Sequence, residues 1–443
     1  LTMNPPLHVE VVQNRQSRAD KEFIKEKVHS YLSNLVTLTP GATIAGAQLE
    51  EESGLREHVR SITLCDAEHE EDVVMTDTEL VYHVYKLDAA GPESDALADS
   101  GSGEEVSVAD VWPLPNEEFH GLWESLVYDT NLKRETLRFA ETAFEFADRG
   151  VDPNVVSWNR VVLLHGPPGT GKTSLCRALA QKLAVRLGER YPRARLLEIN
   201  AHGLFSKWFS ESGKLVARLF EHVREALADR RLLACVLVDE VESLAAARRA
   251  ALAGSEPSDA IRAVNALLTQ LDRLKRHENA LVLTTSNVTG AIDLAFVDRA
   301  DLKRRVGPPG ARAAYGILRG CCEELAARGL VGGGPLFALS VLEAARFERS
   351  AGSAASLRLW AAARAAAARA LSARALRRLP FVARALHCPG APRRAPDLLD
   401  FVEALHAALR QLQLDDEELL PPPRPRRSAP RRYPECPLCQ SAD

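Results

Sequence analysis

The sequence predicts an α/β protein in which a parallel β-sheet, covered by helices on both faces, lies between a small α/β domain and a C-terminal helical domain. Continuously apolar segments that alternate with helix-like segments indicate parallel strands buried on both faces. These segments are 161–165, 195–199, 234–238 and 281–286. A glycine-rich loop follows the first of them and precedes a helix-like stretch, 174–187. Beyond Gly310 the pattern becomes helical and rich in alanine and arginine.

Residues 1–90 are expected to form the small N-terminal α/β domain. Strand-like and helix-like patterns alternate there, and no catalytic signature is visible. The next segment, 91–110, is rich in Gly, Ser, Asp and Glu, which predicts a flexible linker. The chain opens Leu1-Thr2-Met3, so its first residue need not be the native start, although nothing in it resembles a targeting segment.

A phosphate-binding loop is the strongest functional signal in the chain. Residues 166–173 fit the pattern G-x-x-x-x-G-K-[ST] between a strand and a helix, a setting in which backbone N–H groups surround a phosphate. Lys172 is expected to reach the β- and γ-phosphates of ATP, and the Thr173 hydroxyl to ligate Mg²⁺. A chance glycine-rich turn would leave the complete set of fixed positions unexplained. The residues predicted to bind ATP are Gly166, Pro167, Pro168, Gly169, Thr170, Gly171, Lys172 and Thr173.

An acidic pair, Asp239 and Glu240, ends the apolar strand 234–238. Carboxylates are costly near a core, so a pair at this position indicates a functional site. Asp239 is expected to hold Mg²⁺ directly or through water, and Glu240 to polarise the water that attacks ATP. With these two residues, a nucleotide-binding site becomes a hydrolytic one.

Two further candidate side chains follow the next apolar strand. Asn287 is placed to orient the attacking water beside the γ-phosphate, although an asparagine at a strand end also caps turns. Arg299 is a candidate arginine finger that completes the site of a neighbouring subunit. The alternative for Arg299 is a salt bridge to Asp298 or Asp301.

The loop 202–213 contains several large apolar side chains. Aromatic residues exposed on a loop indicate an interaction site. In a ring-shaped motor, Lys207, Trp208 and Phe209 would form a pore loop that grips a polypeptide. The alternative is that the aromatic residues pack against the helix that follows, 211–227.

Composition and charge limit the remaining functions. The net charge of −4 gives no support for nucleic-acid binding, and no apolar run is long enough to span a membrane. Eight scattered cysteines suit reduced thiols rather than a disulfide scaffold. The segment 417–443 is rich in proline and arginine and is expected to be disordered. Its single pair, Cys436 and Cys439, lacks the second pair of ligands that zinc requires.

These motifs resemble those of the AAA+ ATPases, in which GPPGTGKT, LVDE, TTSN and a following arginine precede a helical lid. Five longer segments narrow the resemblance to the pachytene checkpoint ATPase family. They are EFHGLWESLVYD (118–129), LFSKWFSESGKLV (204–216), VDEVESLAAAR (238–248), EPSDAIRAVNALLTQLD (256–272) and AFVDRADLK (295–303). The resemblance implies a large ATPase subdomain at 111–310 and a diverged helical lid at 311–416.

The resemblance also implies a homohexameric remodeller that uses ATP to unfold part of HORMA-domain proteins of the mitotic checkpoint and the meiotic chromosome axis. An adaptor with a HORMA fold, bound by the N-terminal domains, and a location in the nucleus, on chromosomes, and in the cytoplasm are implied as well. The lid arginine of the family falls at Arg374. Ala370 and Ala373 stand where the family has glycines, a change that is harmless where φ is helical and damaging where φ is positive.

Two other functions stay open on the sequence alone. A P-loop kinase or a nucleic-acid-dependent ATPase would share the phosphate loop, but neither a phosphoryl-acceptor site nor a basic, aromatic groove is visible. A nucleotide-dependent scaffold, in which the altered lid leaves binding but little turnover, would share the whole site. Steady-state hydrolysis separates the scaffold from the remodeller, and stimulation by DNA would favour the nucleic-acid-dependent enzyme.

Overall fold

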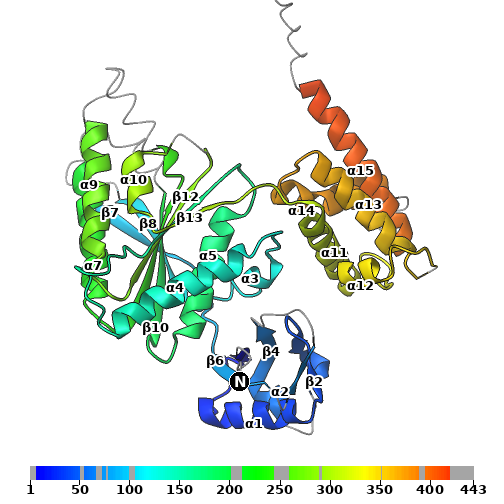
Figure 1. The fold of residues 1–443 in the computed structure, drawn as a ribbon, viewed down its shortest axis with the longest axis horizontal. Helices are drawn as coiled ribbons and strands as arrows, with labels where there is room; N and C mark the ends of the chain where they lie inside the picture. Colours follow the sequence, from blue (N-terminus) through cyan, green and yellow to red (C-terminus); the bar gives the residue numbers. More distant parts are fainter. Residues whose placement is uncertain are drawn as a thin grey trace, which may run out of the picture.

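A computed structural model of the chain shows an N-terminal domain, a large subdomain built on a sheet, and a helical lid (Figure 1). The structure describes residues 6–49, 54–65, 72–75, 78–98, 105–200, 212–243, 259–288, 292–350, 352–388 and 395–419. Within these ranges, no helix combines the length and the apolar character that a membrane span requires. Residues 420–443, which include the proline- and arginine-rich part of the tail and its two cysteines, lie outside the described residues, whereas residues 417–419, also expected to be disordered, end helix α15 (Leu398–Leu419).

The N-terminal domain contains a four-stranded sheet in the order β3-β4-β1-β6. Its strands are β1 (Leu7–Gln13), β3 (Thr43–Ala45), β4 (Val59–Cys65) and β6 (Leu80–Tyr85). Strand β1 pairs antiparallel with β4 and parallel with β6. Helix α1 (Lys21–Ser33) buries Ile24, Val28 and Leu32, which recur every four residues along one helix face. The smaller elements are α2 (Leu55–His58) and the antiparallel pair β2 (Thr37–Leu38) and β5 (Val73–Val74).

The central sheet has seven strands in the order β13-β9-β12-β11-β10-β8-β7. Five of them run parallel to one another: β9 (Val161–His165), β10 (Arg193–Asn200), β11 (Leu232–Asp239), β12 (Ala280–Ser286) and β13 (Leu302–Arg305). The four apolar segments of the sequence are therefore neighbouring strands, and the predicted parallel sheet is confirmed. The sequence pattern missed β13, a short edge strand that is mostly basic.

The prediction of a flexible linker at 91–110 is wrong for its described residues, 91–98 and 105–110, most of which lie in strands. Strand β7 (Glu93–Ala98) pairs antiparallel with β8 (Glu105–Leu114), and β8 pairs antiparallel with β10. Main-chain groups make these bonds, so a polar, small-residue segment can extend the sheet at its edge. Further along β8 the side chains alternate between the two faces of the sheet, with Ala109 and Trp112 in opposite cores.

Helices cover both faces of the sheet (Figure 1). Alternate residues of β9 enter opposite cores, Val161 and Leu163 on one face and Val162 and Leu164 on the other. The first face packs against α7 (Ser212–Leu227) and α9 (Asp259–Leu274), and the second against α3 (Leu122–Ser125), α4 (Leu132–Asp148) and α5 (Lys172–Arg186). The tryptophans at 112 and 123 are buried in the second core. They dock the segment that precedes the phosphate loop.

The lid is a bundle of helices with one apolar core. Its helices are α11 (Ala311–Ala327), α12 (Leu339–Ala344), α13 (Ala354–Ala368), α14 (Ala373–Val382) and α15 (Leu398–Leu419), with a π-helical turn at Ala383–His387. Small side chains on α13, Ala362, Ala363 and Ala366, are fully buried, while Arg364 on the same helix is exposed. The alanines of α13 thus form a packing face of small side chains, and Arg364 lies on the solvent-exposed face of the helix.

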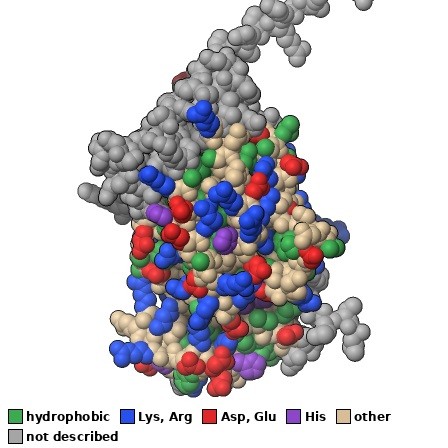
Figure 2. All heavy atoms as spheres, turned by 90° about the vertical axis from the view of Figure 1, so that its left-hand side faces the viewer, with side chains coloured by type: hydrophobic (Ala, Val, Ile, Leu, Met, Phe, Trp, Pro, Cys, Tyr) green, Lys and Arg blue, Asp and Glu red, His purple; other side chains and the backbone are tan. Residues whose placement is uncertain are grey.

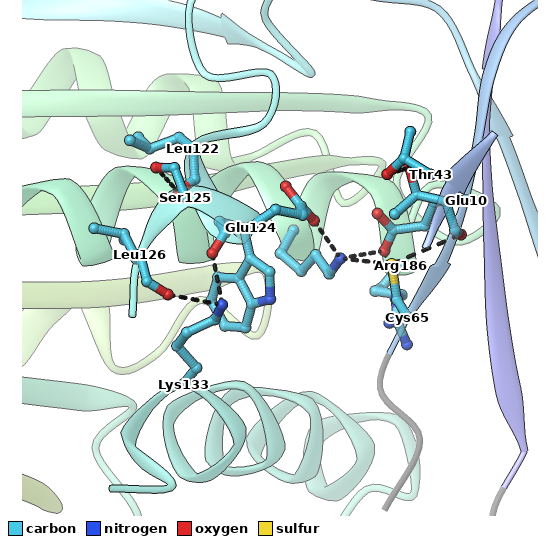
Figure 3. A network of polar contacts seen from close by, with 12 residues as sticks. Glu10, Thr43, Cys65, Leu122, Glu124, Ser125, Leu126, Lys133 and Arg186 are labelled. Carbon is cyan, nitrogen blue, oxygen red and sulfur yellow. Dashed lines mark hydrogen bonds and ion pairs between the residues drawn. The ribbon is translucent and has the colours of Figure 1, made fainter. Parts of the chain in front are cut away.

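A buried ion cluster joins the N-terminal domain to the large subdomain (Figure 3). Glu10 Oε1, on β1, lies 2.8 Å from Lys182 Nζ and 3.0 Å from Arg186 Nε, both on α5. Lys182 Nζ also lies 3.3 Å from Cys65 Sγ and 3.4 Å from a carboxylate oxygen of Glu124. Burial by itself would raise the pKa of Glu10, but the two cations outweigh it and lower the pKa to about 2. Glu10 is therefore ionised and paired at neutral pH.

Candidate nucleotide-binding and hydrolysis site

The phosphate loop joins β9 to α5 at the carboxyl edge of the parallel strands. Gly166 has a φ of 144°, and a Cβ there would lie 2.1 Å from the backbone oxygen of Val306. Gly169 has a φ of 74° and packs against the lid. Glycine is thus required at these two positions by the backbone angles and by the close approach of other segments of the same chain. The N-terminus of α5 adds the partial positive charge that favours a phosphate.

Lys172 is the first residue of α5 and is almost fully buried. Its Nζ donates to the backbone oxygens of Gly166 and Pro167, both at 2.8 Å. Burial lowers the pKa of Lys172, whereas the carboxylates of Glu242, Asp239 and Glu240 raise it. The ammonium group is therefore held inside the loop, where a phosphate would replace carbonyl oxygens as its partner.

Thr173 and Asp239 come together from α5 and the end of β11. Thr173 Oγ1 donates to Asp239 Oδ1 at 3.0 Å, and Thr285 Oγ1 donates to the same carboxylate. A hydroxyl and a carboxylate side by side are the hard oxygen ligands that Mg²⁺ prefers. These two residues fit the ion that the sequence predicted for them.

Glu240 and Asn287 meet beside the phosphate loop, where β11 and β12 end. Asn287 Nδ2 donates to Glu240 Oε1 at 3.0 Å. Glu240 has a φ of 57°, a conformation that costs a non-glycine residue roughly 1–3 kcal/mol and is concentrated at functional sites. The structure thus brings together the two side chains that the sequence assigned to activation of water.

The lid contacts the phosphate loop through the N-terminus of α14 and Ser372, which precedes it. The backbone N–H of Arg374 donates to Gly169 O at 3.0 Å, and a Cβ at Gly169 would lie 2.9 Å from Ser372 Oγ. The charge of Arg374 also lowers the pKa of Lys172, after the larger effect of burial. Arg374 therefore lies at the site. Ala370 has a φ of 51°, whereas Ala373 is the first residue of helix α14, so only the first of the two alanines occupies a strained position.

Arg299 lies at the end of α10 (Leu294–Arg299) and forms a two-pronged ion pair with Asp272 on α9. Its Nε and Nη2 donate to the two Asp272 oxygens at 3.0 and 2.7 Å. Asp301 instead accepts hydrogen bonds from Asn159. The salt bridge of Arg299 thus has a different partner from the two considered in the sequence. The pore-loop candidates Lys207, Trp208 and Phe209 lie outside the described residues.

Family models match three parts of the chain, which correspond to the N-terminal domain, most of the large subdomain and the lid. The AAA model, described as the ATPase family associated with various cellular activities, matches residues 162–308. The TRIP13 N-terminal domain matches residues 2–90, and the TRIP13-like AAA+ ATPase lid C-terminal domain matches residues 310–413. A Rattus norvegicus protein named Pachytene checkpoint protein 2 homolog is 45% identical over 415 residues, 92% of this chain and 93% of that protein. The chain belongs to the pachytene checkpoint family of AAA+ ATPases.

Other members of the pachytene checkpoint family agree with this assignment. An Arabidopsis thaliana Pachytene checkpoint protein 2 homolog is 51% identical over 344 residues, 74% of this chain and 72% of the relative. The solved structure of C. elegans PCH-2 superposes with a TM-score of 0.74 at 32% identity, covering 92% of this chain and 99% of that one. As an AAA+ ATPase, the protein binds and hydrolyses ATP.

Sequence reasoning missed three residues that organise the site of this family member. Thr285 bonds the Asp239 carboxylate and accepts the Glu240 N–H, and Glu242 accepts the N–H of Asn287. Asp129 caps the first lid helix by accepting from the N–H groups at 310 and 313, at 2.6 and 2.9 Å. The repeated polar residues at the end of β12 and the second acid after Asp239 were the available signals.

Proposed function

We propose that this protein is a homohexameric remodeller that uses ATP to unfold part of HORMA-domain proteins. Its work would lie in meiotic recombination and chromosome synapsis, including oogenesis and spermatogenesis, and in silencing of the spindle checkpoint, in the nucleus, on chromosomes, and in the cytoplasm. The contact of Asn287 with Glu240 beside the phosphate loop is the observation that supports it most, because remodelling requires hydrolysis as well as binding. The class of substrate follows from the family resemblance.

In this proposal the phosphate loop holds the triphosphate. Residues 166–173 direct backbone N–H groups at the β- and γ-phosphates, and Lys172 exchanges its bonds with loop carbonyls for bonds to phosphate oxygens. Thr173 and Asp239 would ligate Mg²⁺, which when bound offsets negative charge on the phosphates. Arg374, on the lid, would place a cation beside the γ-phosphate. Loss of the γ-phosphate would remove this contact and allow the lid to move.

Glu240 acts as the general base in this mechanism. Its carboxylate takes a proton from water as the water oxygen attacks the γ-phosphorus, and ADP and phosphate leave. Asn287 holds the carboxylate through its side-chain amide and so limits the directions in which the base points. The neutral amide also offers a hydrogen-bonding group to the attacking water and the γ-phosphate.

Arg299 would act on the nucleotide of a neighbouring subunit. In the described residues of a single subunit it is bound to Asp272 and to the backbone oxygen of Ala295. The Arg299 side chain is one-quarter exposed, and these contacts hold it in one orientation at the surface. Assembly of the ring would exchange the Asp272 contact for the γ-phosphate of the neighbour, where the guanidinium stabilises charge in the transition state.

The N-terminal domain and the loop at 207–209 complete the proposal. The N-terminal domain would receive a HORMA-fold adaptor with its substrate, and Trp208 and Phe209, with Lys207, would pull on the polypeptide in the central pore.

The decisive experiment is ATP-dependent conversion of a HORMA-domain substrate by the purified protein. Lys172→Ala is expected to abolish ATP binding, because the ammonium group that meets the phosphates is lost. Glu240→Gln is expected to bind ATP, form a ring and fail to turn over, with a loss of at least about 100-fold in kcat. Wild-type turnover by Glu240→Gln would contradict the mechanism, and wild-type hydrolysis without conversion would contradict the substrate class.

The same preparation distinguishes the two other functions. A nucleotide-dependent scaffold would show binding with negligible steady-state hydrolysis. A nucleic-acid-dependent ATPase would be stimulated by DNA and not by a folded protein. Against that reading, Lys and Arg side chains lie among Asp and Glu side chains on the face seen in Figure 2, and the net charge is −4.

A further inference from the structure

Glu242 is a third carboxylate at the nucleotide site, two residues beyond Glu240. Its Oε1 accepts the backbone N–H of Asn287 at 3.0 Å. Its Oε2 is buried and has no hydrogen-bond partner among the described residues. Burial has the largest effect on the pKa of Lys172 and lowers it. Among the carboxylates that raise this pKa, Glu242 has a larger effect than Asp239. A buried polar oxygen without a hydrogen-bond partner is costly, so a glutamate at this position needs a reason beyond the capping of a turn.

Four hydrogen bonds join residues 240–242 to residues 285–287, and we call this set the β11–β12 clasp. Glu240 N donates to Thr285 Oγ1 at 3.3 Å, and Val241 N donates to Thr285 O at 3.0 Å. Asn287 contributes the other two, from its backbone to Glu242 and from its side chain to Glu240, both at 3.0 Å. Glu242 is the one side chain in the clasp that fixes the backbone of Asn287.

The clasp holds Glu240 in its strained backbone conformation. Glu240 has a φ of 57°, and a strained residue keeps such a conformation only when its surroundings over-determine it. If the Asn287 backbone were free to move, its amide would no longer meet Glu240, and the carboxylate would sample other directions. Hydrolysis depends on that direction, whereas binding of ATP by the phosphate loop does not.

We propose that Glu242 is a positioning residue for ATP hydrolysis: by anchoring the Asn287 backbone it holds the Asn287 amide against Glu240 and fixes the direction of the general base. The proposal concerns the hydrolytic step alone and does not depend on which protein is remodelled.

The test compares Glu242→Ala, which removes the acceptor, with Glu242→Gln, which retains an acceptor oxygen. Glu242→Ala is expected to lower kcat by about 10- to 100-fold, the usual effect of losing a residue that orients an active-site group. Its KM for ATP and its ATP affinity by calorimetry should stay within about threefold of wild type, because uniform binding is unchanged. Glu242→Gln should recover most of the lost kcat. Glu221→Ala, which removes an exposed carboxylate on α7, is the matched control and should keep wild-type kcat.

A double-mutant cycle tests whether Glu242 acts through Asn287. The variant carrying both Glu242→Ala and Asn287→Ala should be no slower than Asn287→Ala alone, because the group that Glu242 positions is already absent. Additive losses would overturn the proposal, as would wild-type kcat in Glu242→Ala. A loss of ATP affinity that matches the loss of kcat, with no recovery in Glu242→Gln, would assign Glu242 to the general stability of the site and also overturn it.

Discussion

Glu240 at the nucleotide site and Ala370 in the lid have backbone angles that L-amino acids rarely adopt, with φ of 57° and 51°. At Glu240 the strained backbone carries the carboxylate proposed as the general base. At Ala370 it belongs to a helix end, where the N–H groups of Ala370 and Leu371 donate to Ala367 O and Ala366 O. This is the Schellman pattern, whose left-handed position favours glycine. Alanine there leaves a conformational cost in the lid.

Ala370→Gly is therefore expected to stabilise the protein by roughly 1 kcal/mol, because glycine adopts a positive φ without a Cβ clash. Thermal and denaturant unfolding measure the change. Ala373→Gly is the control, since Ala373 begins α14 and glycine gives no gain in a helix. Equal effects at the two positions would contradict the explanation.

At the scale of elements, the sequence predicted the strands that are buried on both faces and missed the edges of the sheet. Apolar runs reveal β9 to β12 because both faces of those strands need burial. Strands β7 and β8 extend the sheet through main-chain bonds, which composition does not report. The part of the site formed by the phosphate loop and the acidic pair was predictable from local pattern. The contact of Glu242 with Asn287 was not, because it exists only after β11 and β12 pair in register.

The proposed role of Arg299, on helix α10, between subunits can be tested with mixed rings. Arg299→Ala and Lys172→Ala are each expected to be inactive alone. Mixing them should restore part of the activity, because a Lys172→Ala subunit supplies Arg299 to a neighbour whose own phosphate loop is intact. The control mixes Lys172→Ala subunits with Glu240→Gln subunits. Each substitution disables the nucleotide site of the subunit that carries it, so this mixture should stay inactive. No recovery in the first mixture would place the action of Arg299 within its own subunit.

At the scale of the whole molecule, the N-terminal domain is fixed to the large subdomain. Glu10 is buried between Lys182 and Arg186, and Lys182 also lies against Cys65 on strand β4. The two domains therefore meet through a satisfied polar interface. Every residue of α5 from Ala178 to Arg186 is buried, so the helix is covered on more than one face.

Glu10→Ala is expected to weaken this interface by about 3–5 kcal/mol, because it leaves two buried cations without their shared partner. Faster hydrogen exchange in β1 and α5, and a larger radius of gyration, would report release of the domain. Glu117→Ala, which removes an exposed partner of Arg15 and Arg60 at the same boundary, is the control and should change little. Unchanged exchange in Glu10→Ala would contradict a fixed domain.

Acid should release the same contact. The pKa of Glu10 falls from 4.5 to about 2 in the folded protein, so its stabilising effect is complete above about pH 4.5 and is lost as the pH falls towards 2. Hydrogen exchange of β1 across that interval would follow the loss. In Glu10→Gln the same interval should show no such step at this interface.

The position of the ion cluster along α5 decides which part of the subunit stays still during the ATP cycle. Helix α5 begins at Lys172 in the phosphate loop and contains Lys182 and Arg186 further along. The same helix therefore contacts the N-terminal domain and forms part of the phosphate loop. The chain enters the lid at residues 307–310, and the lid also contacts this body where the Arg374 N–H donates to Gly169 O. In the proposed remodelling cycle, a lid rotation about that segment would leave a protein held by the N-terminal domain at rest relative to the nucleotide of the same subunit, with the lid as the moving part.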